Sequence, residues 1–200
     1  MFTGIITDVG EVLAVEARGE GLRRLKIACA YPRASIALGA SIACAGVCLT
    51  VVEIGEDAGR SWFAVDTAAE TLKVTTAGRW QRGTRLNLER SLKIGDELGG
   101  HMVLGHVDGI AELISRQGSS DMARLEFRAP RELMRFIAPK GSVALDGVSL
   151  TVNEIMGDTF TAMIIPHTLK VTTFGSLAPG ASLNLEVDVI ARYAARLANA

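Results

Sequence analysis

The sequence predicts an all-β protein made of two tandem homologous Greek-key β-barrels of about six strands each, with short helices and a C-terminal α-helix. Three observations support this fold: an internal repeat along nearly the whole chain, short β-rich runs separated by Gly and Asp turns, and an amphipathic segment after the repeat. The 200 residues are 48% hydrophobic with a mean hydropathy of +0.28, so the chain can bury a sizeable core.

The repeat becomes visible when Gly46 is placed opposite Gly147. The matched blocks, first half with second, are residues 4–6 with 105–107, 49–51 with 150–152, 71–76 with 168–173, and 86–89 with 183–186. These blocks are too far apart for a solenoid of short units. The predicted organisation is a first barrel over residues 1–97, a second barrel over 98–187, and a C-terminal helix over 188–200.

Within the first half, β-rich runs alternate with turn residues and predict its strands in order. The expected strands are residues 2–15, 22–29, 41–44, 47–54, 62–65 and 85–88. Prolines near the start predict short helices over 32–38 and 130–138, and further helical turns are expected over 69–75 and 167–173.

The last segment lies outside the repeat and predicts an amphipathic helix. Ile190, Tyr193, Ala194 and Leu197 fall on one helical face. A helix this short is marginal alone in water, so the face needs a partner. Two alternatives remain open: packing against its own chain, or self-association.

Charge and cysteine content exclude several classes of function. Lys plus Arg is 21 and Asp plus Glu is 22, so no basic excess supports binding to nucleic acid or an anionic membrane. We expect no spanning helix, no secretion signal and a cytoplasmic location. Cys29, Cys44 and Cys48 are an odd number without a CxxC pair, which favours free thiols and no metal site. Dinucleotide and phosphate-loop motifs are also lacking.

The two halves differ where reactive groups could act. Cys48 in the first half matches Ser149, and His106 matches Ile5. Cys48 is either a buried core thiol or a nucleophile; His101 and His106 are either structural or face a pocket. Ser41, Thr50, Ser149 and Thr151 are either strand hydroxyls or hydrogen-bond partners of a polyol. From the residues alone, Lys140 is interpreted as a solvated lysine and Asp146 as a turn residue.

Five motifs together resemble the riboflavin synthase family over essentially the whole chain. They are MFTGI at residues 1–5, GVCLTV at 46–51, GGH with GHV at 99–101 and 105–107, DGVSLTV at 146–152, and IPHTL at 165–169. One departure is Ala45, where the family usually has Asn.

The resemblance implies an enzyme that dismutates two molecules of 6,7-dimethyl-8-ribityllumazine. A four-carbon unit passes from one to the other, giving riboflavin and 5-amino-6-(D-ribitylamino)uracil without a cofactor. The alternative is a non-catalytic lumazine- or flavin-binding protein on the same fold. The resemblance further implies a homotrimer whose active site joins the first barrel of one chain to the second barrel of its neighbour, and allows lumazine synthase as a partner.

By the same resemblance, three residues are the catalytic candidates. His106, aided by Ser41, is the candidate base for the C7 methyl of one lumazine, and Cys48, or water, adds to or steers the other. The implied substrate contacts are Phe2, Gly4, Ile5, Ile6, Val47, Cys48, Leu49, Thr50, Asp66, Thr67, Ala68, Ala69, Glu70, Thr71, Gly105, His106, Val107, Lys140, Asp146, Ser149, Leu150, Thr151, Ile164, Ile165, Pro166, His167 and Thr168.

Overall fold

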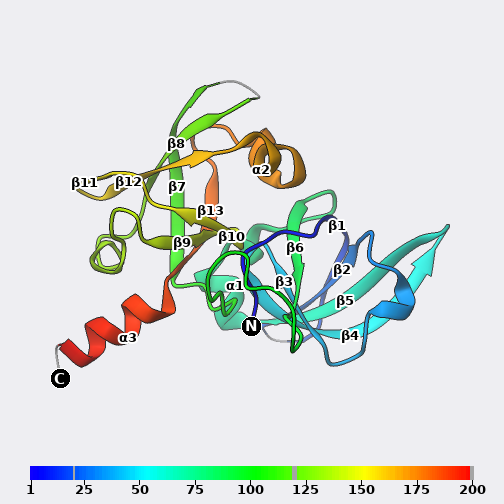
Figure 1. Ribbon diagram of the computed structural model, residues 1–200. Helices are drawn as coiled ribbons and strands as arrows, with labels where there is room; N and C mark the ends of the chain where they lie inside the picture. The colour runs from blue at the N-terminus through cyan, green and yellow to red at the C-terminus, as the bar shows by residue number, and fades with distance from the viewer. Residues whose placement is uncertain (20, 119–120, 199–200) are drawn as a thin grey trace.

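The computed structural model describes residues 1–19, 21–118 and 121–198 and shows two β-barrel-like domains in sequence, as predicted (Figure 1). The first is a closed barrel with strand order β1-β2-β5-β4-β3-β6. Its strands are β1 (Asp8–Ala17), β2 (Leu22–Ala28), β3 (Ser41–Cys44), β4 (Val47–Asp57), β5 (Arg60–Ala68) and β6 (Arg85–Arg90). No helix in the described residues is both long and apolar enough to cross a membrane.

The second domain is a seven-stranded sheet with order β10-β9-β13-β7-β8-β12-β11. Its strands are β7 (Gly109–Gly118), β8 (Ala123–Arg128), β9 (Ser142–Leu145), β10 (Val148–Thr151), β11 (Ile155–Met156), β12 (Thr159–Ile164) and β13 (Ser182–Val187).

The counterpart of β4 is split into β10 and β11 because Asn153 interrupts it. In the first barrel this place is a bulge at Val52 in the pairing of β4 with β5. In the second, Asn153 Oδ1 accepts a hydrogen bond from Met163 N at 2.9 Å, and Asn153 N donates to Thr161 O at 2.8 Å. The side chain therefore continues the contact with β12 where the backbone ladder stops.

Alternating side chains fill each barrel with its own core. In the first barrel, Ile27, Phe63 and Leu88 are fully buried. In the second, Phe127 and Phe160 pack with their ring centroids 5.6 Å apart. In a strand with one buried and one outer face, every second side chain points into the core. Because side chains fill the inside of each barrel, a ligand-binding site has to lie on the outer face of the strands.

The strand predicted over residues 2–15 begins only at Asp8, so that prediction was wrong in its first part. The polar backbone of this segment is bound by a buried carboxylate instead of a strand ladder. Glu89 accepts from Thr3 N at 2.6 Å, Thr3 Oγ1 at 2.7 Å and Gly4 N at 2.9 Å. Burial raises the pKa of Glu89, and these hydrogen bonds act in the opposite direction.

The helices agree with the sequence in place, although some are shorter. Residues 32–38 and 130–138 form only the 3-10 turns η1 (Arg33–Ser35) and η3 (Met134–Phe136). The other predicted segments form α1 (Ala69–Val74) with η2 (Thr76–Arg79), α2 (Pro166–Val171) with η4 (Thr173–Ser176), and α3 (Val189–Ala198). Residues 199–200 of the predicted C-terminal helix lie outside the described residues.

Replacing Ala45 with Asn should stabilise the protein. Ala45 and Gly46 have φ of +43° and +76°, so the turn between β3 and β4 needs two left-handed residues. That is the type I′ turn, for which Asn-Gly and Asp-Gly are preferred. We expect Ala45→Asn to raise the free energy of unfolding in urea by about 1 kcal/mol.

Ala58→Asn is the matched control, because Ala58 has φ +50° in the exposed turn between β4 and β5. A gain for Ala58→Asn with a loss for Ala45→Asn would show that crowding between the barrels outweighs the relief of backbone strain at Ala45.

Candidate functional site

The two barrels meet around an approximate twofold axis defined by equivalent residues. Phe2 N donates to Val103 O at 2.7 Å, and Val103 N donates to Phe2 O at 3.1 Å. Gly46 and Gly147 also touch: a Cβ on Gly46 would lie 2.7 Å from Gly147 N, and one on Gly147 would lie 2.9 Å from Gly46 N. Only glycine allows this approach. Equivalent segments of the two repeats therefore lie on the two sides of this contact. Each side offers one candidate binding surface, called a half-site below.

Two buried asparagines connect the two barrels by hydrogen bonds across the axis. Asn87 Nδ2 donates to Asp146 O at 3.1 Å, and Asn87 Oδ1 accepts from Thr173 N at 2.8 Å. Asn184 repeats the pattern in reverse, donating to Ala45 O at 2.8 Å and accepting from Thr76 N at 2.7 Å. Each asparagine satisfies backbone groups of the other barrel, so the relative placement of the two sites is fixed by direct hydrogen bonds.

The first half-site lies on the outer face of β3 and β4. Cys48 pairs with Ala43 and Thr50 pairs with Ser41 in the strand register, so these side chains share one face. Thr50 is exposed, while Ser41 and Cys48 are half-buried. Val47 and Leu49 point into the barrel core instead. A thiol and two hydroxyls thus face the same surface.

The backbone of the second repeat completes this half-site. Cys48 N donates to Gly105 O at 2.9 Å, and a Cβ on Gly105 would lie 2.5 Å from Cys48 Cβ. Glu186 holds the segment, accepting from Leu104 N, Gly105 N and His106 N at 2.7, 2.9 and 3.1 Å. His106 itself is exposed.

The N-terminal segment of each repeat crosses onto the other barrel, so Gly105, the residue before His106, contacts Cys48 of the same chain. The approach of His106 to Cys48 of a neighbouring chain stays a prediction from the sequence.

The second half-site repeats the arrangement with different chemistry. Ser149 N donates to Gly4 O at 2.8 Å, as Cys48 N does to Gly105 O. Ser149 is half-buried and Thr151 is exposed on the same face of β10. Lys140 is exposed nearby in the chain, with φ +67° where the first repeat has Gly39 at φ +80°. A lysine in this conformation is strained, and such strain is concentrated at functional positions.

The remaining predicted contact residues fall into three groups by accessibility. Phe2, Thr67 and Ile164 are buried, and the Thr67 hydroxyl has no described hydrogen-bond partner. The Asp66 carboxylate forms an ion pair with Arg24, whose Nε and Nη2 each donate a hydrogen bond to it at 2.8 Å. These hydrogen bonds lower the Asp66 pKa. The accessible ones around α1 and α2 are Ala68, Ala69, Glu70, Ile165, Pro166 and His167, while Thr71 and Thr168 are half-buried.

Sequence reasoning missed the residues that shape both half-sites: Asn87, Glu89, Asn184 and Glu186. A signal for them was present, because Leu-Asn-Leu-Glu is repeated at residues 86–89 and 183–186. A polar pair kept within an apolar strand of both repeats points to a buried role shared by the two halves.

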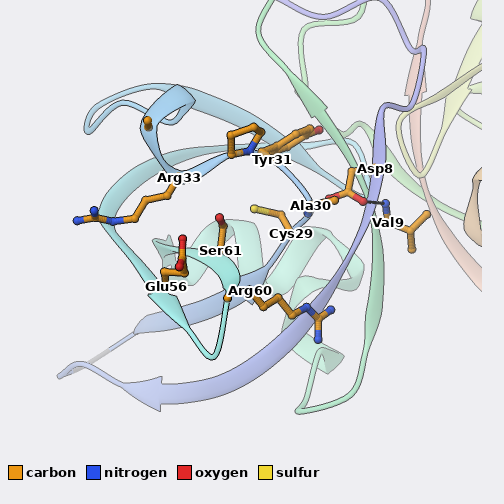
Figure 2. A pocket seen from close by; sticks show the side chains of 12 residues that line it. Asp8, Val9, Cys29, Ala30, Tyr31, Arg33, Glu56, Arg60 and Ser61 are labelled. Atoms are coloured by element: carbon orange, nitrogen blue, oxygen red, sulfur yellow. Dashed lines mark hydrogen bonds between the residues drawn. The ribbon is translucent and has the colours of Figure 1, made fainter.

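A cavity of about 720 Å³ lies at one side of the first barrel and is lined by Cys29, Tyr31 and Arg60 among others (Figure 2). Another, beside α1, is lined by Ala69, which is one of the predicted substrate contacts. Cys48, His106 and Ser149 line none of the five described cavities. Within the described residues, no group of three His, Cys, Asp or Glu side chains is placed to hold a metal ion. Thr50, His106 and Thr151 are exposed, so both half-sites are accessible from the surface of the chain.

Asp146 gives this region a predictable pH dependence of stability. Its Oδ1 accepts from Asn184 N at 2.8 Å, and burial raises its pKa to about 7. A carboxyl group with a raised folded-state pKa stabilises the fold most below its unfolded pKa of about 4, and that stability is lost as the pH rises toward 7. Asp146→Asn keeps the acceptor and removes the charge.

We therefore expect Asp146→Asn to unfold at nearly the same temperature as the parent at pH 4. By pH 8 it should be more stable by roughly 4 kcal/mol, since each pH unit between the unfolded and folded pKa values contributes about 1.36 kcal/mol. Thermal unfolding followed by circular dichroism between these pH values measures the difference. A difference that does not change with pH would contradict the assignment of a raised pKa.

Comparison with known proteins agrees with the duplicated site. The family model described as lumazine binding domain matches the chain twice, at residues 3–91 and 104–188. Riboflavin synthase of Brucella abortus is 54% identical over 199 residues, covering 99% of this chain and 98% of that protein. Riboflavin synthase of Mycobacterium tuberculosis is 42% identical, covering 98% of both chains.

A solved structure shares the same architecture. The crystal structure of LumP complexed with riboflavin superposes with a TM-score of 0.81 and 25% identity, covering 94% of this chain and 99% of that chain. Two matched domains, full-length relatives and the duplicated half-sites lead to one assignment. The chain belongs to the riboflavin synthase family and carries two lumazine binding domains.

Proposed function

We propose that the protein is a transferase that makes riboflavin from two molecules of 6,7-dimethyl-8-ribityllumazine, releasing 5-amino-6-(D-ribitylamino)uracil. One substrate gives up a four-carbon unit and the other receives it. Atoms and electrons balance between two copies of one substrate, so the reaction needs no outside oxidant. The full-length riboflavin synthase relatives support this activity.

One observation carries the proposal: the chain presents two half-sites of the same construction with unequal reactive groups. Cys48 N and Ser149 N make equivalent hydrogen bonds to Gly105 O and Gly4 O. Two molecules of the same substrate fit two related sites, while a donor and an acceptor need different chemistry. The thiol of Cys48 against the hydroxyl of Ser149 supplies that difference.

The three catalytic candidates take the following roles. His106, held at its backbone by Glu186, takes a proton from the C7 methyl group of the donor lumazine. Ser41 assists from the same face of the sheet as Cys48. Cys48 steers or adds to C7 of the acceptor. Holding the two rings together supplies much of the acceleration.

We further propose that the active protein is a homotrimer, in which the first barrel of one chain covers the second barrel of the next. One feature supports a partner chain: α3 projects from the body of the molecule (Figure 1), with Ile190, Tyr193 and Leu197 exposed. A cytoplasmic location and association with lumazine synthase stay predictions.

The purified protein tests the function directly. Incubated with the lumazine and a chelator, without added cofactor, it should form one riboflavin for every two substrate molecules consumed, measured by absorbance and chromatography. Binding of the lumazine without riboflavin formation would contradict the enzyme. It would favour the alternative of a flavin-binding protein, to which the fold of LumP complexed with riboflavin is similar.

Cys48→Ala should lower kcat by about tenfold or more while the dissociation constant for riboflavin changes little. The thiol lies on the shared face of the half-site, and its loss affects the reacting geometry more than the binding surface. Steady-state kinetics and fluorescence titration separate the two quantities. Cys48→Ser, which keeps a polar group of similar size, is the matched variant, and unchanged turnover in Cys48→Ala would remove the residue from the mechanism.

A further inference from the structure

The end of the first barrel holds a cavity that the proposed function does not use. Its volume is about 720 Å³, and it lies where β2 ends and β5 begins, whereas α1 follows the other end of β5. Ser61 alternates along β5 with the core residues Phe63 and Val65, so its side chain belongs to the inner face of the barrel. In Figure 2 the side chains of Ser61 and Cys29 both point to the middle of the cavity, which gives the cavity a polar floor.

The hydroxyl group of Ser61 is buried in this floor without a hydrogen-bond partner. Ser61 is 8% exposed, and within the described residues its Oγ neither donates nor accepts a hydrogen bond. Cys29 is 4% exposed, and burial raises the pKa of its thiol, so the thiol is uncharged near pH 7. A buried hydroxyl that lacks a partner destabilises a fold, so its position at a cavity points to a bound molecule.

The second barrel shows that these two polar side chains are not needed to close a barrel. In the first barrel, Cys29 N donates to Ser61 O at 3.0 Å. In the second, the equivalent hydrogen bond runs from Ala129 N to Asp158 O, also at 3.0 Å. Asp158 is exposed, and its Oδ2 lies 3.5 Å from Arg128 Nε. The second barrel therefore has neither a thiol nor a buried hydroxyl at this place.

The charged residues around the cavity favour an uncharged ligand. Both carboxylate oxygens of Asp8 accept hydrogen bonds from backbone N–H groups, at 2.8 and 2.6 Å. Arg60 forms an ion pair with Glu11 at 3.1 Å. Arg33 and Glu56 are exposed and opposite in sign, and Figure 2 shows the Arg33 side chain extending away from the middle of the cavity. An ion that entered would give up its hydration without gaining an opposite charge.

We propose that this end of the first barrel binds a small uncharged molecule with an apolar body and one hydroxyl or carbonyl group. That group bonds to Ser61 Oγ, which can both donate and accept. Tyr31, Pro32 and Ala34 supply apolar surface around the opening. Cavities of roughly 300–1,000 Å³ with a few convergent polar groups are typical of small-molecule sites. The inference goes beyond the proposed function and does not depend on it.

Two probes that differ in one hydroxyl group, p-cresol and toluene, test the hydrogen bond to Ser61. In isothermal titration calorimetry, the parent protein should bind p-cresol about fivefold more tightly than toluene. In Ser61→Ala the two dissociation constants should agree within about twofold, because the partner of the cresol hydroxyl is removed. The same preference for p-cresol in Ser61→Ala as in the parent would overturn the proposal. So would a lack of saturable binding, which would leave the Ser61 hydroxyl to water.

Thr161→Val is the matched control, because Thr161 carries a second buried hydroxyl without a partner in the described residues. Thr161 is 2% exposed and lines none of the five described cavities. This variant should keep the preference for p-cresol, and its loss would overturn the proposal. If circular dichroism shows that Ser61→Ala does not fold, Ser61→Cys keeps the size of the side chain. It should also lose the preference, because a thiol is a weak donor and acceptor.

Riboflavin separates this site from the two half-sites. Saturating riboflavin should leave the dissociation constant of p-cresol unchanged, because Cys48 and Ser149 do not line the cavity. Displacement of p-cresol by riboflavin would place the probe in a half-site and overturn the proposal. The Ser61 comparison measures binding alone, so it decides the proposal even if the protein makes no riboflavin.

Discussion

Replacing His106 with alanine should lower kcat by about 100-fold or more while the dissociation constant for the lumazine changes by less than about threefold. General acid–base groups contribute roughly 10²–10⁴-fold to rates. His106 is exposed, and its backbone N donates to Glu186 at 3.1 Å, so the ring is presented from a fixed segment. Steady-state kinetics and fluorescence titration provide the measurement.

The control for His106→Ala is Glu56→Gln, an exposed residue at the cavity on the other side of the first barrel. This variant should keep the turnover of the parent. Glu186→Gln should lower turnover by less than His106→Ala does. Its amide offers only one oxygen to the three backbone N–H groups of the segment that carries His106. Turnover of His106→Ala equal to that of the parent would exclude His106 as the base.

The duplicated barrel could be predicted from the sequence because its signals are local. Strand β3 begins and ends where predicted, and the helices after β5 and β12 are where the repeated Thr-Leu-Lys-Val-Thr-Thr occurs. The period of two and the turn glycines act within a few residues of each other, and the repeat is found by comparing the two halves of the sequence. Such features need no knowledge of the three-dimensional partners.

The contacts between the barrels could not be predicted in the same way. Glu89 binds Thr3 and Gly4, which are far away in the chain, and Asn184 binds Ala45 O on the other barrel. The N-terminal segment was predicted as a strand because it belongs to a β-rich run, yet its backbone is bound by a buried carboxylate. Tertiary partners of this kind override local propensity.

The candidate site was predicted in part. The sequence identified Cys48, Ser149 and His106 as positions where the repeats differ, and the structure places Cys48 and Ser149 at equivalent points of two half-sites. It missed the contact between His101 and Ser149. No spacing rule links a loop histidine to a strand serine 48 positions away.

The helix α3 is the element whose removal should have the largest effect on assembly. Its apolar residues Ile190, Tyr193 and Leu197 are 63%, 64% and 77% exposed, so the alternative of packing on its own chain does not account for this face. The start of the helix is attached through buried Val189 and the contact of Arg192 Nη2 with Asp108 at 2.7 Å. Equivalent helices around a symmetry axis would cover such a face in a closed oligomer.

We therefore expect a chain lacking residues 190–200 to sediment as a monomer and to lose most of its turnover, while each barrel stays folded. Val189 is kept in this variant because it is buried. If the neighbouring chain supplies the second barrel that covers Cys48, separating the chains removes one of the two substrates from the reacting pair. The loss of proximity then acts directly on kcat. Sedimentation velocity, an activity assay and circular dichroism on one preparation measure the three quantities.

Arg192→Ala is the matched control for the truncation, because it removes the contact with Asp108 but leaves the apolar face intact. It should keep both the trimer and most of the turnover. Leu197→Lys tests the face without shortening the chain: Leu197 is the most exposed of the three apolar residues, and a charge there would have to be buried on assembly. A trimer that persists in both the truncated chain and Leu197→Lys would assign assembly to the barrel surfaces. The half-sites would then be completed by contacts between the barrels themselves.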